Sequence, residues 1–276
     1  ERAIVRRKTL DESLAAMRAA LAEKDPYRAL QIRLDLLTQY PALSTNKDLV
    51  GLVEESMTSA LTSIEATPEV ELQQLPVGDK PPTPDSSWIT PVLVARVRSD
   101  QTSEGRVVLG SAADQILAID SETARPLWKH SVGETGLPFP SVIPTGDGND
   151  ILLFHAGEST LSRIRGLDGQ AIWRSQLTSR PRGRPVIYRD TIYLVTDQRE
   201  LLAMDATSGK LVQRLVFPVN LVGEPAIGSD GEGLFVVAES SVVYSLRRTP
   251  LEATAVTFTA HAAGSVSVSP LPMGAL

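Results

Sequence analysis

The sequence contains no cysteine among its 276 residues. Disulfide bonds, thiolate nucleophiles and cysteine metal ligands are therefore excluded. It also lacks an apolar run of about 18 residues, the length that a membrane-spanning helix needs. Its 27 lysines and arginines are outnumbered by 33 aspartates and glutamates, which gives a net charge of −6. General nucleic-acid binders are usually basic, so we do not expect a nucleic-acid partner. Because no apolar run is long enough, we do not expect a membrane-spanning segment in this sequence either.

The motifs of common catalytic sites are missing as well. The three histidines, His130, His155 and His261, do not have the spacing of metal ligands. The sequence has no phosphate-binding loop, no dinucleotide fingerprint and no Gly-x-Ser-x-Gly nucleophile motif. We therefore predict no catalytic residues, no metal, no cofactor and no enzymatic activity.

What the sequence does contain is an internal repeat. An apolar run, a polar turn and a second apolar run recur in ILAIDSETARPLW (116–128), LSRIRGLDGQAIW (161–173) and LLAMDATSGKLVQ (201–213), and more loosely in VYSLRRTPLEATA (243–255). The last residues of these segments, at 128, 173, 213 and 255, are 45, 40 and 42 positions apart. A period of about 40–45 residues with several short strands per unit is typical of propeller blades.

The third unit shows the expected strands most clearly. Its β-rich runs cover residues 185–188, 191–196, 200–205 and 210–217, and their short gaps predict antiparallel neighbours joined by tight turns. Gly209 stands at a turn position that suits a positive φ, and Gly169 stands there in the second unit. The first unit has Ala124 at this point, so we expect a different turn geometry there.

The repeat resembles that of pyrroloquinoline-quinone-type β-propellers, L-x-A-[IM]-D-x-x-[TS]-G-K-x-x-W. Residues 116–120 with Trp128 and residues 201–205 with Gly209 and Lys210 carry it best, and Arg165 replaces the aspartate in the second unit. The likeness extends from Trp88 to the end. It implies a mainly β fold of four-stranded blades. We expect about four blades, the first strand of a fifth at 263–270, and a larger ring in the native chain.

The resemblance also implies structural roles for the repeated residues. In such repeats the tryptophan lies on the outer strand and packs between neighbouring blades, while the indole N–H finds one partner. The aspartates are expected to cap turns. The structural motif thus comprises Asp120, Trp128, Gly169, Trp173, Asp205 and Gly209. A likeness to the quinoprotein dehydrogenases of this family would imply a quinone and calcium near the ring axis with a catalytic aspartate. No position in this sequence matches that set.

Residues 9–66 read as helices rather than strands. Leu10, Leu14, Met17 and Leu21 recur at helical spacing, and Thr9 followed by Glu12 predicts a capping box at the helix start. Pro26 suits the first turn of a second helix that resembles a tetratricopeptide helix, and a third is expected at about 47–65. We predict a helical module at 1–66, a proline-rich linker at 67–87 and an incomplete propeller at 88–276.

Two candidate binding sites stand out. Residues 146–150, GDGND, have the oxygen ligands of a calcium loop, although a hairpin turn is favoured there, as it is at 188–190 and 228–233. Arg180, Arg182 and Arg184 alternate in an extended segment, so all three would face one side and could contact an anion. A solvated loop is favoured over binding here, and the patch is the best candidate for a binding site.

These observations favour a non-catalytic scaffold that binds protein partners through propeller loops and a helical docking module. Two alternatives are a quinone- or metal-dependent oxidoreductase with its site in other blades and the ligand-sensing domain of a larger envelope or signalling protein. The partner's identity is not encoded in any motif. The resemblance suggests the bacterial periplasm or cell envelope.

Overall fold

A computed structural model describes residues 2–68, 71–81, 92–96, 107–112, 114–133, 140–145, 148–239 and 242–258. The chain divides into two compact units. The first comprises residues 1–67, 199–201 and 215–276, and the second comprises residues 68–198 and 202–214. These units differ from the predicted boundaries at 66 and 87, which stay a prediction.

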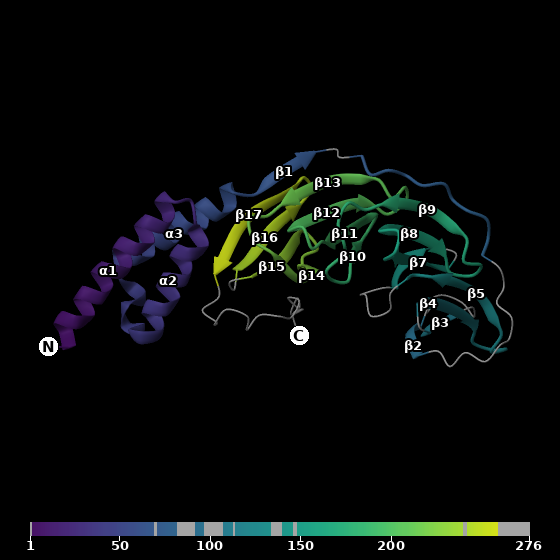
Figure 1. Ribbon diagram of the computed structural model, residues 1–276, viewed down its shortest axis with the longest axis horizontal. Coiled ribbons are helices and arrows are strands. Elements are labelled where there is room, and N and C mark those ends of the chain that lie inside the picture. The colour runs from purple at the N-terminus through teal and green to yellow at the C-terminus, as the bar shows by residue number, and fades with distance from the viewer. Residues whose placement is uncertain are drawn as a thin grey trace. The chain divides into compact units, whose positions relative to one another are not determined.

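Three α-helices open the first unit: α1 (Arg2–Ala22), α2 (Pro26–Gln39) and α3 (Lys47–Thr62), with a short 3₁₀ helix at Pro41–Thr45 (Figure 1). Pro26 begins α2 as expected, and the carboxylate of Asp25 caps that helix by accepting from the backbone N–H of Arg28 at 3.0 Å. The predicted capping box is wrong, because α1 begins upstream at Arg2. Thr9 lies inside α1 and its hydroxyl donates to the carbonyl of Val5.

The helices pack onto a β-blade within the same unit. This blade, the fourth, is the antiparallel sheet β14 (Leu221–Ile227), β15 (Gly233–Ala238), β16 (Val242–Arg248) and β17 (Leu251–Phe258). Phe258 packs against the helical core, and the hydroxyls of Tyr27 and Tyr244 share a hydrogen bond. Phe217 meets the Tyr244 ring edge-on at 4.9 Å. Helices and blade therefore share one apolar core.

Two blades belong wholly to the second unit. The first blade is the antiparallel sheet β2 (Val92–Arg96), β3 (Val107–Ala112), β4 (Gln115–Asp120) and β5 (Pro126–Ser131). The second blade is the antiparallel sheet β6 (Ser141–Thr145), β7 (Gly148–His155), β8 (Thr160–Arg165) and β9 (Ala171–Gln176). The strand order follows the chain order in both, so β5 and β9 are the outer strands.

The third blade contains β10 (Val186–Tyr188), β11 (Thr191–Val195), β12 (Glu200–Asp205) and β13 (Leu211–Val216), and β1 (Glu65–Pro68) pairs with its outer strand β13. These strands match the runs expected from the sequence within one or two residues. The prediction of a mainly β fold with four blades is confirmed. The proposed fifth-blade strand at 263–270 lies outside the described residues.

The turn that joins the two apolar runs of a repeat has the same geometry in the first, second and third blades. The residues at this position, Ala124, Gly169 and Gly209, have φ values of 57°, 71° and 71°. Each also donates its backbone N–H to the carbonyl four residues earlier, at 2.8 to 2.9 Å. The expectation of a different turn at Ala124 is therefore wrong. The backbone hydrogen bonds impose the left-handed conformation even on an alanine, for which it is unfavourable.

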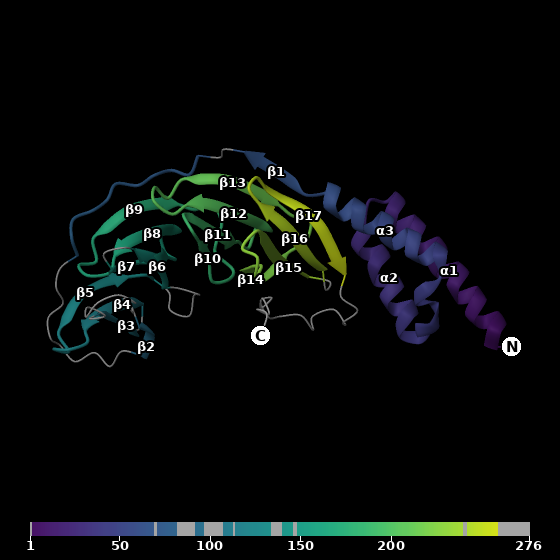
Figure 2. The ribbon, with the colours of Figure 1, turned by 180° about the vertical axis from the view of Figure 1, so that it is seen from behind.

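Residues 71–81, which we call the edge segment, lie against the second blade. Gln74 pairs antiparallel with Ser175 of β9. The N–H of Leu75 donates to Arg174 O at 2.8 Å, and the N–H of Gln176 donates to Gln73 O at 2.9 Å. Figure 2 shows this stretch following the outer side of β9. Part of the predicted proline-rich linker thus covers the hydrogen-bonding edge of a sheet.

Candidate functional site: the groove between the first two blades

Two tryptophans define the grooves between successive blades of the second unit. Trp128, fully buried on β5, donates its indole N–H to Gly166 O at 2.8 Å in the second blade. Trp173 on β9 donates in the same way to Ala206 O at 2.9 Å in the third blade. Each indole therefore joins two blades through one hydrogen bond and a large apolar contact, the role that its repetition predicted.

The glycine of the following blade lies directly beneath each tryptophan. A Cβ built at Gly169 would stand 2.6 Å from the Trp128 ring, and one at Gly209 would stand 2.5 Å from the Trp173 ring. Both glycines also have positive φ. Glycine is thus required at each position for two reasons: the turn conformation and the close approach of the ring.

Outside Trp128, the first groove contains a polar pocket of about 260 Å³. It is lined by His130, Ser131, His155, Glu158, Ser162, Ile164, Ala171 and Arg174, and by Gly78 and Asp79 of the edge segment. Two histidines that lie 25 positions apart in the sequence meet here, with ring centroids 6.1 Å apart and an interplanar angle of 78°. They come from β5 and from the end of β7.

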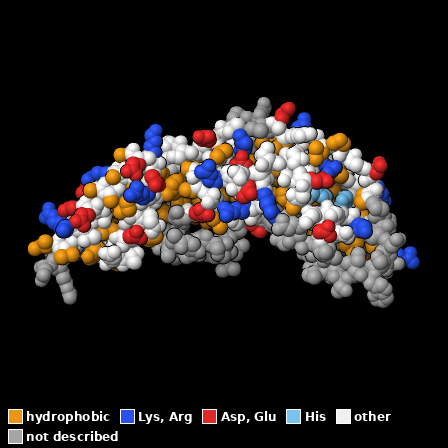
Figure 3. Space-filling model, in the orientation of Figure 1, with side chains coloured by type: hydrophobic (Ala, Val, Ile, Leu, Met, Phe, Trp, Pro, Cys, Tyr) orange, Lys and Arg blue, Asp and Glu red, His pale blue; other side chains and the backbone are white. Residues whose placement is uncertain are grey.

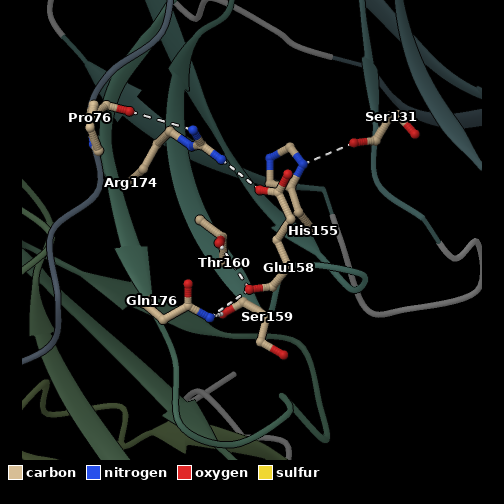
Figure 4. A network of polar contacts seen from close by, with 8 residues as sticks. All are labelled: Pro76, Ser131, His155, Glu158, Ser159, Thr160, Arg174 and Gln176. Atoms are coloured by element: carbon tan, nitrogen blue, oxygen red, sulfur yellow. Dashed lines mark hydrogen bonds and ion pairs between the residues drawn. The ribbon is translucent and has the colours of Figure 1, made fainter.

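Backbone carbonyls fix the tautomer of each imidazole. His130 Nε2 lies 2.7 Å from Gly169 O, and His155 Nδ1 lies 2.9 Å from Ser131 O (Figure 4). A carbonyl only accepts, so both nitrogens carry a proton. In the neutral ring the other nitrogen, Nδ1 of His130 or Nε2 of His155, then presents a lone pair.

The surroundings favour the neutral form of both rings. Burial lowers the pKa of His130; its bond to the Gly169 carbonyl raises it in part, and the charge of Arg174 lowers it. Burial also lowers the pKa of His155, with opposing contributions from the Ser131 carbonyl and Glu158 and further lowering from His130 and Arg174. The two histidines are therefore expected to carry no charge near pH 7.

A charged pair lies beside the histidines. The guanidinium of Arg174 donates to Glu158 Oε2 at 2.7 Å and to Pro76 O of the edge segment at 3.5 Å. The side-chain amide of Gln176 donates to Glu158 O at 2.6 Å, so the turn that carries Glu158 is anchored to β9 (Figure 4). The space-filling view shows imidazole atoms reaching the surface close to acidic side chains (Figure 3).

Ser162 adds an unusual polar atom to the pocket. Its residue is 1% exposed, and its hydroxyl has no hydrogen-bond partner among the described residues. Buried hydroxyls are normally satisfied, so this one is available to a water molecule or to a group that enters the pocket. The groove therefore combines two imidazole lone pairs, a hydroxyl and an ion pair. Within the described part of the chain, no three His, Asp or Glu side chains are grouped to hold a metal ion.

The predicted arginine patch lies elsewhere in the second unit, on the connection into β10. Arg180, Arg182 and Arg184 are exposed, and the residues between them, Pro181 and Gly183, are buried. Pro181 pairs with Thr196 across an isolated bridge, and the N–H of Arg182 donates to Val195 O at 2.9 Å. The alternation expected from the sequence is present, on a backbone held by hydrogen bonds. Its role in binding stays a prediction.

The remaining predicted residues occupy turns. Asp120 Oδ1 accepts from the N–H groups of Glu122 and Thr123, and Asp205 Oδ1 accepts from the N–H and hydroxyl of Ser208. Asp150, the last residue of the suggested calcium loop, instead pairs with Arg163 at 2.6 Å in a largely buried position. Gly146 and Asp147 lie outside the described residues, as does His261.

Sequence reasoning missed the histidine pocket and the role of the edge segment. His130 follows Trp128 by two positions, and Ser175 follows Trp173 by two positions. Aligning the repeats on the tryptophan would have placed His130 in the groove. Nothing in the spacing of His155 indicated that the two rings would meet.

No helix in the described residues is long and apolar enough to cross a membrane. No curated protein matches the chain. Similar solved structures include BamB from Moraxella catarrhalis, with a TM-score of 0.42 and 15% identity over 55% of this chain and 50% of that one. Another is Hsv2 from Kluyveromyces lactis, with a TM-score of 0.41 and 12% identity over 56% and 49%. The chain thus spans about half the length of these proteins.

The family described as the outer membrane protein assembly factor BamB matches residues 85–251, more than half of the chain. The matched segment contains the first three repeats, part of the fourth, and both groove tryptophans. This agrees with the resemblance to pyrroloquinoline-quinone-type propellers and with the four antiparallel blades. The chain therefore belongs to the β-propeller family of the outer membrane protein assembly factor BamB.

Proposed function

We propose that this protein is a non-catalytic scaffold that binds a protein partner through the connection between its second and third blades. The observation that carries the proposal is the exposure of Arg180, Arg182 and Arg184 on a backbone that is already hydrogen-bonded in place. A docking surface with a fixed backbone loses little conformational entropy on binding. The family's description as an assembly factor supports a binding role.

The chemistry of the patch indicates an acidic partner segment. Successive arginines two positions apart in an extended chain are separated by about 7 Å, so carboxylates on alternate residues of a partner strand could meet them. The backbone around them is fixed at three points: Asp197 N–H donates to Arg180 O at 2.9 Å, Arg180 N–H donates to Asp197 Oδ1 at 3.1 Å, and Arg182 N–H donates to Val195 O. Guanidinium groups pair with carboxylates in a bidentate manner that lysines do not reproduce.

The test compares the wild type with the double variant Arg182→Glu/Arg184→Glu after cross-linking and purification from native cells. Recovery of a defined protein partner should fall at least about tenfold in the double variant, because two favourable charge contacts become repulsive. Raising the salt concentration should weaken the wild-type complex. The matched control is Lys210→Glu/Arg247→Glu, which makes the same charge change at two other exposed positions.

Equal recovery from the arginine variant and the wild type would contradict this docking site. A loss that is as large in the Lys210/Arg247 control would assign the effect to net charge instead. Deleting the helices is not a clean test of a helical docking arm, because Phe258 and Tyr244 contact them in a shared core. The oxidoreductase and ligand-sensing alternatives stay predictions, and titration with a quinone cofactor and calcium would test the first of them.

A further inference from the structure

We propose that His130 and His155, together with Glu158 and Arg174, form a proton-operated clasp that holds the edge segment on the second blade near neutral pH and releases it in acid. The inference rests on the pocket and on the hydrogen bonds of residues 71–81, and it is independent of the arginine patch. It assigns a function to a pair of partly buried titratable groups that the docking proposal does not use.

The charged groups around the two rings come from several separate segments. The edge segment contributes Asp79, the turn between β7 and β8 contributes Glu158, and β9 contributes Arg174. On the β5 side, Asp114 accepts from the hydroxyl of Ser131 at 3.2 Å. Near neutral pH one carboxylate, Glu158, is already engaged by Arg174 at 2.7 Å.

Protonation changes this balance. Each ring already uses one N–H to bond a carbonyl, so the added proton appears on His130 Nδ1 or on His155 Nε2 as a new donor. Two imidazolium rings 6.1 Å apart would repel each other and also the guanidinium of Arg174. Burial already lowers the pKa of both histidines, which is the sign of a folded structure that disfavours these charges.

Glu158 is the acceptor for which the groups compete. It raises the pKa of His155 through its charge, so a charged His155 attracts the same carboxylate that Arg174 binds. Figure 4 shows the bond between the carboxylate of Glu158 and the guanidinium of Arg174. If Glu158 turns to His155, Arg174 loses its counter-ion while it faces two positive rings.

Arg174 transmits the change to the edge segment. Its guanidinium donates to Pro76 O, and its backbone carbonyl accepts the N–H of Leu75. The edge segment has other anchors as well, among them Gln176 N–H to Gln73 O, the side chain of Gln74 and the buried side chain of Leu72. Displacement of Arg174 therefore acts on the segment directly. Release would uncover backbone donors and acceptors of β9, which an extended partner segment could then pair with.

Amide hydrogen exchange at pH 7.5 and pH 5.5 tests the clasp on the unmodified protein, with rates expressed as protection factors. The amides of Leu75 and Gln176 should lose protection at least about tenfold at the lower pH, the factor that corresponds to one unit of pKa change. The amides of residues 202–204, in the central strand β12, should keep theirs. Unchanged protection at Leu75 and Gln176 between the two pH values would overturn the proposal.

The variant His130→Gln/His155→Gln removes both protonation sites and keeps a side-chain amide able to donate to Gly169 O and Ser131 O. Its protection at Leu75 and Gln176 should be the same at both pH values. The matched control is His261→Gln, which also removes a histidine and should respond to acid as the wild type does. A double variant with the full wild-type response would overturn the proposal.

If the double variant does not fold, the wild type still decides the question through titration of its ¹³C-labelled imidazoles by NMR. Two histidines should titrate below the reference pKa of about 6.5, over the same pH range in which Leu75 and Gln176 lose protection. Normal titration of all histidines, or a loss of protection more than about one pH unit away from their titration, would overturn the clasp.

Discussion

The two grooves of the second unit have the same apolar construction and different polar chemistry. In both, a tryptophan on an outer strand lies over a glycine with positive φ and donates to a carbonyl of the next blade. Two positions after the tryptophan, the first groove has His130 and the second has Ser175. Both side chains approach the carbonyl of the turn glycine, His130 reaching Gly169 O and Ser175 Oγ reaching Gly209 O, each at 2.7 Å.

The edge segment completes the two grooves differently. In the second groove, Gln74 places its side-chain amide 3.0 Å from Ser175 Oγ and 3.3 Å from Gly209 O, so the polar atoms are satisfied within the protein. In the first groove, Gly78 and Asp79 line a pocket that contains two imidazoles and a hydroxyl without a partner among the described residues. One position per repeat therefore sets the chemistry of a groove, while the tryptophan and glycine set its packing.

Removing a groove tryptophan should have the largest effect of the changes considered. Trp128→Ala and Trp173→Ala should each lower the free energy of unfolding by about 3–5 kcal/mol, because each leaves a cavity between two blades. Urea denaturation followed by circular dichroism measures this. Phe at either position should retain most of the stability but not the indole hydrogen bond. A loss below 1 kcal/mol at one site would show that its groove does not hold the blades together.

Adding one methyl group beneath the indole ring should have the second largest effect on stability. Gly169→Ala and Gly209→Ala should each cost about 2–4 kcal/mol, since the new Cβ overlaps a ring and the backbone has a positive φ. Ala124→Gly is the matched control, because Ala124 lies at the same turn position and the wild-type residue already carries a Cβ. It should change stability by less than about 1 kcal/mol. Thermal unfolding of the three variants gives the comparison, and equal effects would remove the ring contact as the cause.

Lowering the pH should destabilise the first groove and leave the second unchanged. The pKa of both histidines is lowered in the folded protein, so the unfolded chain binds more protons between that pKa and about 6.5. Their contribution to stability is therefore complete above about pH 6.5 and is lost as the pH falls through that window. The urea midpoint at pH 7.5 and 5.5 should differ less in His130→Gln/His155→Gln than in the wild type. An identical pH dependence would show that other groups cause the loss.

Substitutions in the second groove should have the smallest effects on stability, and these effects should not depend on pH. Ser175→Ala and Gln74→Ala should each cost about 1 kcal/mol, the usual net value of one hydrogen bond. The double variant should cost less than the sum, because the two side chains bond each other. A double-mutant cycle at pH 7.5 and 5.5 measures both properties. Additive costs would mean that Gln74 and Ser175 act separately.

The blades were predictable because each one is encoded locally. Alternating apolar residues and short polar gaps define β10 to β13, and the same tryptophan and turn recur at a fixed period. Local reasoning failed where two hydrogen-bonding choices compete. Thr9 has the residue type of a helix cap, yet its hydroxyl bonds Val5 O inside α1. At Ala124 the turn's backbone bonds outweigh the residue's preference for negative φ.

The polar pocket was not predictable, because its parts come from separate segments. His130 and His155 are far apart in sequence, and only the packing of the first blade on the second brings them together. The proline-rich composition of the edge segment predicted an extended linker but did not identify its neighbour. Gln74 finds β9 through backbone groups that every residue has, so no sequence motif marks the contact.

The pairing of Gln74 with Ser175 also places a constraint on the order of folding. Ser175 follows Gln74 by 101 positions and must be synthesised before this contact can form, whereas the hairpins within a blade close over short loops. During synthesis residues 71–76 leave the ribosome early and have no partner until β9 follows. We therefore expect the edge segment to join the second blade last, after β6 to β9 have formed.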